Sequence, residues 1–221
     1  RTNFIWDKPN FINDHHIALA YYGERKDEPF KMVSDVPESF ESLVNKSRTT
    51  DTLNYWFKGA TLDSLKFEIE IQDTLRTKTV FFKDPIEDSL VIKKLTSGSL
   101  KLKNKLELES NLPITEVNSD KLIVTNKDTI QIPSFLKIED NYDRVTVDFE
   151  VSPNDVYQIK LLPDALKDFW GQTHDTLVFK TSTKKIEDYG NIYLRVQHQT
   201  PYPYIIELLN NKKVVRRYDS P

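Results

Sequence analysis

The sequence predicts an all-β protein built from tandem antiparallel β-sandwiches. Apolar and polar residues alternate with a period of two along much of the chain, which is typical of strands with one buried and one solvated face. The alternation is clearest in Leu65–Gln72 and returns in Val145–Val151. Short strands at close spacing, with polar turns between them, favour sandwich modules. Only Asp164–Phe169 suggests a helical turn, because Pro163 before it suits the first position of a helix.

The alternation places a first β-sandwich module at residues 1–83. Its strands are expected at His16–Tyr22, Phe30–Val36, Phe40–Lys46, Thr52–Phe57, Leu65–Gln72 and Thr77–Phe82. On one sheet face we expect four buried side chains, those of Leu65, Phe67, Ile69 and Ile71. The acidic run Asp84–Asp88 contains a proline and indicates a turn-rich junction. Junctions between modules are exposed and contact-poor, so the first module is expected to end here.

A second module is predicted at residues 84–187. Its clearest strands are expected at Leu100–Leu108, Val145–Val151, Tyr157–Leu161 and Leu177–Phe179. The alternation breaks at Lys184–Gly190, and residues 188–221 form a partial β module with strands at Asn191–His198 and Tyr204–Tyr218. Asn210–Asn211 resembles a hairpin turn within the last of these. Two strands cannot form a stable domain alone, so this segment is expected to pack on the second module or to begin a third.

Composition narrows the class of protein. The 221 residues are 38% hydrophobic and 11% aromatic, which is ample for a packed core. The formal net charge is only -3, so we expect no nucleic-acid partner. Solvated strand faces explain the local basic clusters, which are Lys184–Lys185 and Lys212–Lys213 with Arg216–Arg217. The absence of cysteine excludes disulfides and thiol catalysis. No apolar run reaches the roughly 20 residues that cross a bilayer.

No catalytic, cofactor or metal signature is present, so we expect a protein that is not an enzyme and carries no cofactor. Zinc needs converging ligands at fixed spacing, which the four histidines lack: His15, His16, His174 and His198. Asp140, Asn141 and Asp143 offer oxygen ligands, but the glycine and distal glutamate of an EF-hand loop are missing. A solvated hairpin turn is the favoured interpretation of these three residues.

The tripeptide Asp-(Ser/Thr)-(Leu/Ile) occurs six times, each where a turn gives way to an alternating apolar run. One explanation is structural: Asp suits the turn, Thr suits a strand, and Leu or Ile is the first residue pointing into a core. The tripeptide also resembles the O-glycosylation sequon of Bacteroidetes, which acts on exported proteins. Both explanations can hold together. The modified hydroxyls, each expected to face solvent, would be those of Thr52, Ser64, Thr74, Ser89, Thr129 and Thr176.

The run from Val156 to Thr181 resembles the last two strands of the bacterial Ig-like domain named after the S-layer protein SbsA. That family has a strand, a helical turn, an Asp-x-x-Gly-Asn corner and a final strand that closes on Phe-x-Thr. The matching residues here are Asp168, Gly171, Phe179 and Thr181, while Gln172 replaces the usual Asn. Gly171 suits a corner that needs a positive φ angle.

From Thr50 to the C-terminus the chain resembles the Ig-like-domain lipoproteins of Flavobacteria and relatives. The resemblance rests on Asp51–Phe57 and on Glu187–Asn191, which leads into a module similar to the transthyretin-like fold. It implies Ig-like sandwiches, a signal peptide and a lipidated Cys upstream of this fragment, and no known chemistry. The implied location is the outer membrane, at the cell surface or the periplasmic face, and the lipid anchor would be the only contact with the membrane.

We therefore expect a non-enzymatic structural or interaction scaffold with protein partners at the outer membrane. A larger envelope complex, for surface-protein export or barrel assembly, is the expected setting. The alternative is a carbohydrate-binding module of a surface glycan-handling system, although Trp56 and Trp170 are favoured as core or corner residues. The prolines in Thr200–Tyr204 keep that stretch extended and at an edge, so Tyr202 and Tyr204 are candidate contacts for a partner or a glycan.

Overall fold

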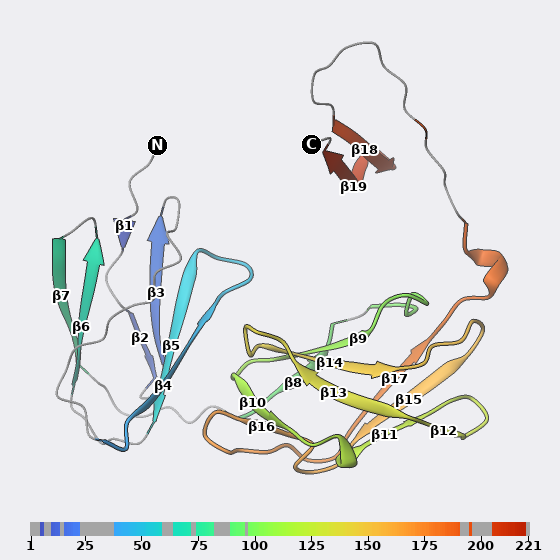
Figure 1. Cartoon of the computed structure of the whole chain (residues 1–221), viewed down its shortest axis with the longest axis horizontal. Coiled ribbons are helices and arrows are strands. Elements are labelled where there is room, and N and C mark those ends of the chain that lie inside the picture. Colours follow the sequence, from blue (N-terminus) through green and yellow to red (C-terminus); the bar gives the residue numbers. More distant parts are fainter. Residues whose placement is uncertain are drawn as a thin grey trace. The chain divides into compact units, whose positions relative to one another are not determined.

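The computed structural model of the protein confirms the all-β fold class. It describes residues 5–6, 10–13, 16–22, 38–58, 64–71, 74–81, 89–95, 97–190, 195 and 205–219. Within these residues the regular elements are antiparallel strands and two short 3₁₀ turns, η1 (Ser119–Lys121) and η2 (Ile186–Asp188) (Figure 1). The chain divides into two compact units, Arg1–Ile186 and Glu187–Pro221. The predicted boundary between residues 83 and 84 lies outside the described residues.

The first unit begins with an antiparallel sheet, here called the N-terminal sheet, in the order β1-β3-β5-β4, with β2 paired to β3. Its strands are β1 (Ile5–Trp6), β2 (Asn10–Asn13), β3 (His16–Tyr22), β4 (Glu41–Lys46) and β5 (Thr52–Lys58). Ala18 on β3 lies opposite Asn54 on β5. The residues that flank this pair, Ile17, Leu19 and Leu53, are buried on one face of the sheet. A separate hairpin joins β6 (Ser64–Ile71) to β7 (Thr74–Phe81).

The strand predictions for this part agree with the structure wherever the residues are described. β3 has the predicted bounds, and β4 to β7 begin and end within three residues of theirs. The predicted strand Phe30–Val36 lies outside the described residues. So do the side chains expected to be buried on β6, those of Leu65, Phe67, Ile69 and Ile71.

The rest of the first unit, here called the sandwich, contains two four-stranded antiparallel sheets (Figure 1). One has the order β13-β14-β9-β8, with strands β8 (Ile92–Lys94), β9 (Leu106–Ser110), β13 (Ser134–Ile138) and β14 (Arg144–Phe149). The other has the order β12-β11-β15-β17, with strands β11 (Leu122–Thr125), β12 (Gln131–Ile132), β15 (Val156–Leu161) and β17 (Leu177–Ser182). A short ladder pairs β10 (Ile114–Val117) with β16 (Leu166–Asp168). Non-consecutive strands are therefore neighbours in each sheet, as in Greek-key sandwiches.

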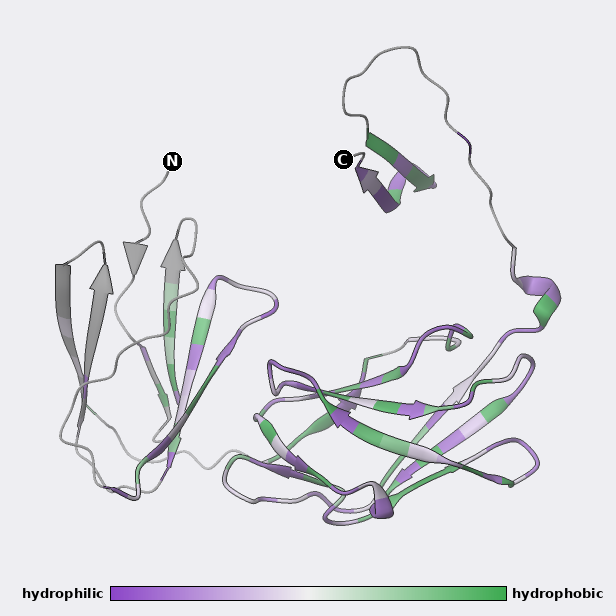
Figure 2. Ribbon diagram, in the orientation of Figure 1, coloured by the Kyte–Doolittle hydropathy of each residue, from purple (hydrophilic) through white to green (hydrophobic). Residues whose placement is uncertain are grey.

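The core of the sandwich consists of the alternate residues that the sequence pattern indicates. On β14 and β15 the buried members are Val145, Val147, Phe149, Tyr157, Ile159 and Leu161. Figure 2 shows the same alternation as green and purple bands along the strands. The Tyr157 hydroxyl accepts a hydrogen bond from the Ser152 amide at 2.6 Å, a tyrosine-corner contact that fastens the β14–β15 turn.

The prediction of a helical turn at Asp164–Phe169 is wrong. Asp164 has a φ of +67°, which ends any helical path, and the chain continues as the strand β16. Leu166 and Asp168 are each 1% exposed, because the strand conformation turns both side chains inward. Pairing with β10 satisfies the main chain here and outweighs the local helix preference of Ala165, Leu166 and Lys167.

The predicted strand Leu100–Leu108 is also wrong over its first six residues. Only its last three residues belong to β9, which begins at Leu106, and a tight turn closed by the Asn104 amide on the Lys101 carbonyl precedes it. Leu100 is still buried, at 1% exposure, because its amide donates to the Ser182 carbonyl at 2.7 Å and holds the loop on the sandwich.

In the second unit the described residues form the hairpin of β18 (Ile205–Asn210) and β19 (Lys213–Asp219). Asn211 and Lys212 occupy the turn with φ angles of +49° and +65°. Two positive φ angles are the mark of a type I′ turn, so the predicted turn Asn210–Asn211 is one residue too early.

Three further predictions for this unit cannot be compared with the structure. Of the predicted strand Asn191–His198 only Arg195 is described. Tyr202 and Tyr204, the candidate contacts for a partner or glycan, lie outside the described residues.

Candidate functional site

Aromatic, hydrogen-bond and ion-pair contacts are concentrated at the seam. The seam is defined here as the contact between the N-terminal sheet and the sandwich, both within the first unit. At one end of the seam Trp56 of β5 packs in a buried cluster with Leu112 and Phe169 of the sandwich. Trp170 meets Trp56 edge-on, with ring centroids 5.9 Å apart and planes at 73°. Aromatic pairs favour this geometry, which adds specificity to the area buried.

Two polar contacts fasten this apolar end of the seam. The Trp170 indole N–H donates to the Phe57 carbonyl at 3.1 Å. Lys58 donates from Nζ to the Phe169 carbonyl at 2.8 Å, and the same ammonium lies 4.6 Å from the centroid of the Phe169 ring. In each module, then, a main-chain carbonyl accepts a hydrogen bond from a side chain of the other module. The two bonds fix how the modules are aligned as well as that they touch.

The corner after β16 presents Phe169 and Trp170 to the seam. Asp168 accepts hydrogen bonds at Oδ1 from the amides of Trp170 (2.9 Å) and Gln172 (2.8 Å), and Gly171 follows with a φ of +83°. Gln172 contributes only its main chain to these bonds, and its side chain is exposed. The replacement of the usual Asn by Gln172 therefore leaves the corner intact.

The carboxyl of Asp168 differs from an ordinary aspartate in its pKa and in its hydrogen bonding. Burial raises its pKa above the ordinary aspartate value, although the amides of Gln172, Trp170 and Gly171 and the charge of Lys58 all act in the opposite direction. Its Oδ2 atom is buried and has no hydrogen-bond partner. The ionised form is therefore under-solvated at this position.

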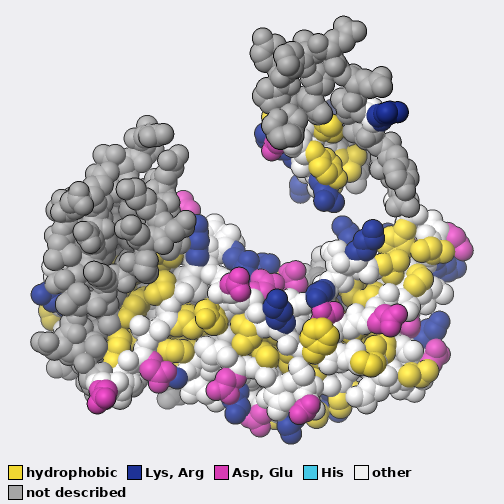
Figure 3. Space-filling view, viewed as in Figure 1, with side chains coloured by type: hydrophobic (Ala, Val, Ile, Leu, Met, Phe, Trp, Pro, Cys, Tyr) yellow, Lys and Arg dark blue, Asp and Glu magenta, His cyan; other side chains and the backbone are white. Residues whose placement is uncertain are grey.

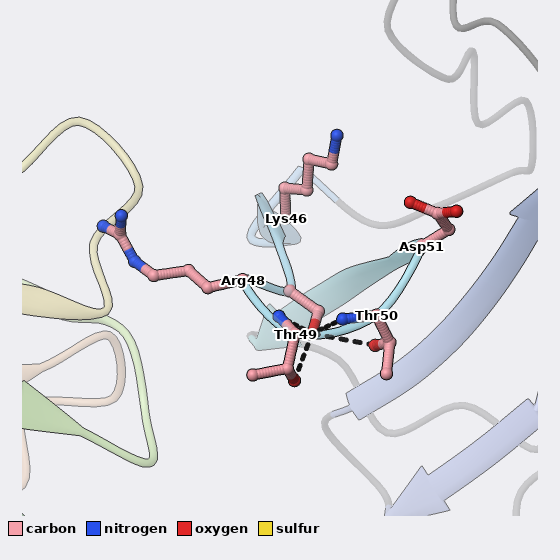
Figure 4. Close-up of a pocket in the computed structure, with 6 residues that line it drawn as sticks. Lys46, Arg48, Thr49, Thr50 and Asp51 are labelled. Carbon is pink, nitrogen blue, oxygen red and sulfur yellow. Dashed lines mark hydrogen bonds between the residues drawn. The ribbon is translucent and has the colours of Figure 1, made fainter. Parts of the chain in front are cut away.

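At the other end of the seam the β4–β5 turn meets the β13–β14 loop. Figure 4 shows Arg48 extending from this turn toward the sandwich. Its guanidinium donates to both carboxylate oxygens of Asp143, at 2.7 and 2.8 Å, and to Glu139 at 2.9 Å. Bidentate pairs of this kind are shorter and more directional than single charged contacts. Asn141 adds two bonds with the main chain of Lys46, accepting at 2.8 Å and donating at 2.9 Å.

The β4–β5 turn holds Arg48 in place through its own hydroxyls. Ser47 Oγ accepts from the amides of Thr49 and Thr50, at 3.3 and 3.2 Å, and from the Thr50 hydroxyl at 2.8 Å (Figure 4). Residues 46–51 line a shallow open hollow of about 280 Å³. The hydroxyls of Ser47 and Thr50 shape the turn that carries Arg48.

The pKa of Asp143 is shifted in the opposite direction to that of Asp168. Burial would raise it, but the hydrogen bonds from Arg48 and Asn141 and the charge of Arg48 outweigh burial and lower it below the ordinary value. Ionised Asp143 is therefore stabilised by the seam, while ionised Asp168 is penalised.

A polar network orients Trp56 from within the N-terminal sheet. The His16 ring is stacked on the indole with centroids 3.7 Å apart, and its Nε2 lies 3.0 Å from Asn54 Oδ1. Asn45 Oδ1 accepts from both Asn54 Nδ2 and Trp56 Nε1, each at 3.1 Å. Trp56, at 5% exposure, is thus enclosed and offers no flat face to a sugar.

The candidate glycosylation residues differ in exposure where their side chains are described. Ser89, Thr129 and Thr176 are exposed, and Thr52 and Ser64 are half-buried. The side chain of Thr74 lies outside the described residues.

The apolar residue of the tripeptide points inward in most of the described copies. Leu53 is buried, and Leu90 and Leu177 pack against buried clusters. Ile130 is the exception: it is 61% exposed, because Thr129 before it takes a φ of +61° in a turn. The structural explanation of the tripeptide therefore fails at this copy.

No metal-ligand cluster of three or more His, Cys, Asp or Glu residues occurs within the described parts of the chain. His174 is buried and its Nδ1 donates to the carbonyl of the next residue at 2.6 Å, while His15 and His198 lie outside those parts. Asn141 and Asp143 do belong to a hairpin loop, but their side chains bond across the seam instead of facing water alone. Nothing local in the sequence signals that role, since Arg48 lies 95 residues away.

No protein-family model matches the chain, and no curated protein matches it in sequence. The resemblance to Ig-like lipoproteins therefore stays a prediction. Among the described residues no helix is long and apolar enough to span a membrane.

Proposed function

We propose that the chain is a non-enzymatic structural and interaction scaffold of an exported cell-envelope lipoprotein, and a subunit of a larger outer-membrane complex. The seam is the observation that carries this proposal. A scaffold must hold its docking surfaces at a fixed distance, whereas modules joined only by a linker move relative to one another by default. The buried cluster around Trp56 and the bidentate contact of Arg48 supply that rigidity. Export and the outer-membrane setting rest on the resemblance to flavobacterial lipoproteins.

Affinity capture of the full-length protein from its native host tests this proposal. Wild type and a control variant, Lys137→Ala, should each retain the same partner proteins in near-stoichiometric amounts. Lys137 is exposed on β13, and its side chain makes none of the seam contacts described above. A seam variant, Trp56→Ala with Arg48→Ala, should keep its β signature but lose partners that contact both modules. Capture of no stoichiometric partner by the wild type would contradict the scaffold role.

We also propose that the exposed sequon hydroxyls carry glycans in native material. Ser89, Thr129 and Thr176 support this, because a bulky polar glycan is tolerated only where its hydroxyls stay in water. Intact mass spectrometry of protein from the native host should show added hexose-type mass, and material from a heterologous cytoplasm should lack it and still fold. An unmodified native mass would leave the tripeptide without a role in export.

The carbohydrate-binding alternative draws no support from the described aromatic residues of the seam. Trp56 is enclosed by His16 and Trp170, and the Trp170 indole N–H is bonded. Glycan-array binding that disappears in Tyr202→Ala or Tyr204→Ala would favour that alternative over the scaffold.

A further inference from the structure

Charge is sharply segregated along the sandwich. Residues 90–105 and 176–186 together contain eight lysines and no acidic residue. The stretch between them, residues 106–175, has 14 acidic residues against six basic ones. The charges of these two portions of the sandwich are opposite and cancel, so the net charge of residues 90–186 is close to zero. The lysines are Lys93, Lys94, Lys101, Lys103, Lys105, Lys180, Lys184 and Lys185.

The fold brings the two lysine-rich segments together at one side of the sandwich. β8 and β17 are the terminal strands of their respective sheets. Lys94 donates from Nζ to the Lys180 carbonyl at 2.6 Å, and the Leu100 amide donates to the Ser182 carbonyl at 2.7 Å, so both segments share one border. We call this border the basic edge: Lys93, Lys94, Lys101, Lys103, Lys180 and Lys184.

Most of these ammonium groups face solvent. Lys94 is half-buried, and the other five side chains of the basic edge are exposed. The acidic neighbours include Glu109, which lies opposite Lys93 in register and also approaches Arg144 at 3.8 Å. They also include Glu107 and Asp155, whose main-chain carbonyls accept hydrogen bonds from the amides of Leu95 and Thr183. Glu187 and Asp188 follow the second segment in sequence, and Lys105, beside the basic edge, is paired with Asp148.

Exposed aliphatic side chains occur in the same two segments as the lysines. Val91, Val178 and Ile186 are 45%, 50% and 60% exposed. Figure 3 shows dark blue and yellow side chains next to one another at the end of the sandwich where residues 182–186 leave it. The one aromatic residue of the two segments, Phe179, is half-buried against the core and offers no stacking surface.

This combination of side chains favours one kind of partner. Recognition of individual phosphates favours arginine, whose planar fork binds them bidentately, and single-stranded nucleic acid needs exposed aromatic rings. The basic edge has neither. Flexible lysines beside exposed aliphatic residues suit the surface of an anionic bilayer, where charge attracts and apolar groups enter the headgroup boundary.

We propose that the basic edge binds the surface of a membrane that contains anionic lipid headgroups. This contact goes beyond the scaffold role and beyond the lipid anchor expected from the sequence, and it would orient the sandwich on the membrane. It needs no protein partner, so vesicle binding by the purified chain tests it separately from the capture experiment.

Co-sedimentation with vesicles tests the proposal on the whole 221-residue chain. Vesicles of phosphatidylcholine with 30% phosphatidylglycerol should bind the protein at low salt and release it as salt rises, and vesicles of phosphatidylcholine alone should bind little. The variant K101Q/K103Q/K180Q should bind the anionic vesicles about a hundredfold more weakly, at about fivefold per lysine. Its melting temperature should stay close to wild type, because no side-chain bond of these three lysines holds the described fold.

A matched variant, K121Q/K127Q/K137Q, removes the same charge from exposed lysines elsewhere on the sandwich. It should bind anionic vesicles within about threefold of wild type. Equal losses in the two variants would show that only net charge matters and would overturn the proposal. Equal binding to neutral vesicles, no binding, or full displacement by a short oligonucleotide at equal phosphate concentration would overturn it too. Ile186→Ser should weaken vesicle binding severalfold, and no effect would remove the apolar part of the contact.

Discussion

The strands β14 and β15 of the sandwich and the hairpin β18–β19 are all rich in aliphatic residues, but these residues lie in opposite environments. In the sandwich the inward residues of the two strands are between 0 and 9% exposed, whereas Leu208, Leu209 and Val214 of the hairpin are 44–56% exposed. The sandwich has a second sheet to cover each apolar face, and a two-stranded hairpin has none of its own. Aliphatic residues in a strand therefore do not by themselves predict burial, which depends on a partner layer from a distant part of the chain.

The largest expected difference separates Ile159 from Leu209. Ile159→Ala should lower the free energy of unfolding by about 2–5 kcal/mol, because it leaves a cavity at a residue that is 0% exposed. Leu209→Ala in the hairpin should change it by no more than about 0.5 kcal/mol. Urea unfolding followed by circular dichroism measures both. A loss above about 2 kcal/mol for Leu209→Ala would show that the hairpin is covered by a layer that makes it part of a core.

Substitutions at the seam should lower the free energy of unfolding by amounts between those expected for Ile159→Ala and Leu209→Ala. Trp56→Phe keeps an aromatic ring in the buried cluster but removes the bond from Nε1 to Asn45, so a loss of about 1–2 kcal/mol is expected. Trp170→Phe, which removes the bond to the Phe57 carbonyl at a half-buried site, should lose about 0.5–1 kcal/mol. If the two modules unfold independently, only the transition of the N-terminal sheet should shift with Trp56→Phe. One common transition for both modules that shifts as a whole would show that the seam couples them.

An ion pair at the seam, Arg48 with Asp143, can be compared with an ion pair in the hairpin, Arg217 with Asp219. Arg48→Ala should cost about 1 kcal/mol at pH 7, because the pair with Asp143 is bidentate but partly exposed. Arg217→Ala, which removes the fully exposed pair with Asp219 in the hairpin, should have no measurable effect.

The contribution of Arg48 should also depend on pH. Since the seam lowers the pKa of Asp143, the stabilisation is present above the ordinary aspartate pKa and is lost as the pH falls through the lowered one. The difference between wild type and Arg48→Ala should therefore shrink in strong acid. A difference that is constant with pH would assign the effect of Arg48 to packing.

A strand is predictable from the sequence where its own residues carry the pattern. It is not predictable where it forms only by pairing with a distant part of the chain. Strands such as Arg144–Phe149 and Val156–Leu161 are recognised because their own residues carry the alternation. Asp164–Phe169 is misjudged because Ala165, Leu166 and Lys167 favour a helix locally, and only pairing with β10 makes a strand of them.

The seam shows this limit most clearly. Trp56 and Trp170 are recognisable as core or corner residues, but not as partners of each other. Trp170 lies 113 residues from Phe57, the neighbour of Trp56 whose carbonyl accepts its hydrogen bond. Asn141 and Asp143 look like any polar turn in sequence. Their role appears only when the fold brings Lys46 and Arg48 beside them.

The smallest expected effect concerns Asp168, whose pKa burial raises above that of an unfolded aspartate. A raised carboxyl pKa means that stability is complete below the unfolded pKa and declines as the pH rises through the folded one. Asp168→Asn keeps an oxygen to accept from the Trp170 and Gln172 amides and removes the charge. The stability of the variant relative to wild type should therefore improve between acid and neutral pH, opposite in sign to the change expected for Asp143→Asn. Parallel pH curves for the variant and the wild type would mean that the corner carboxyl is solvated, and the under-solvated Oδ2 would then have no energetic consequence.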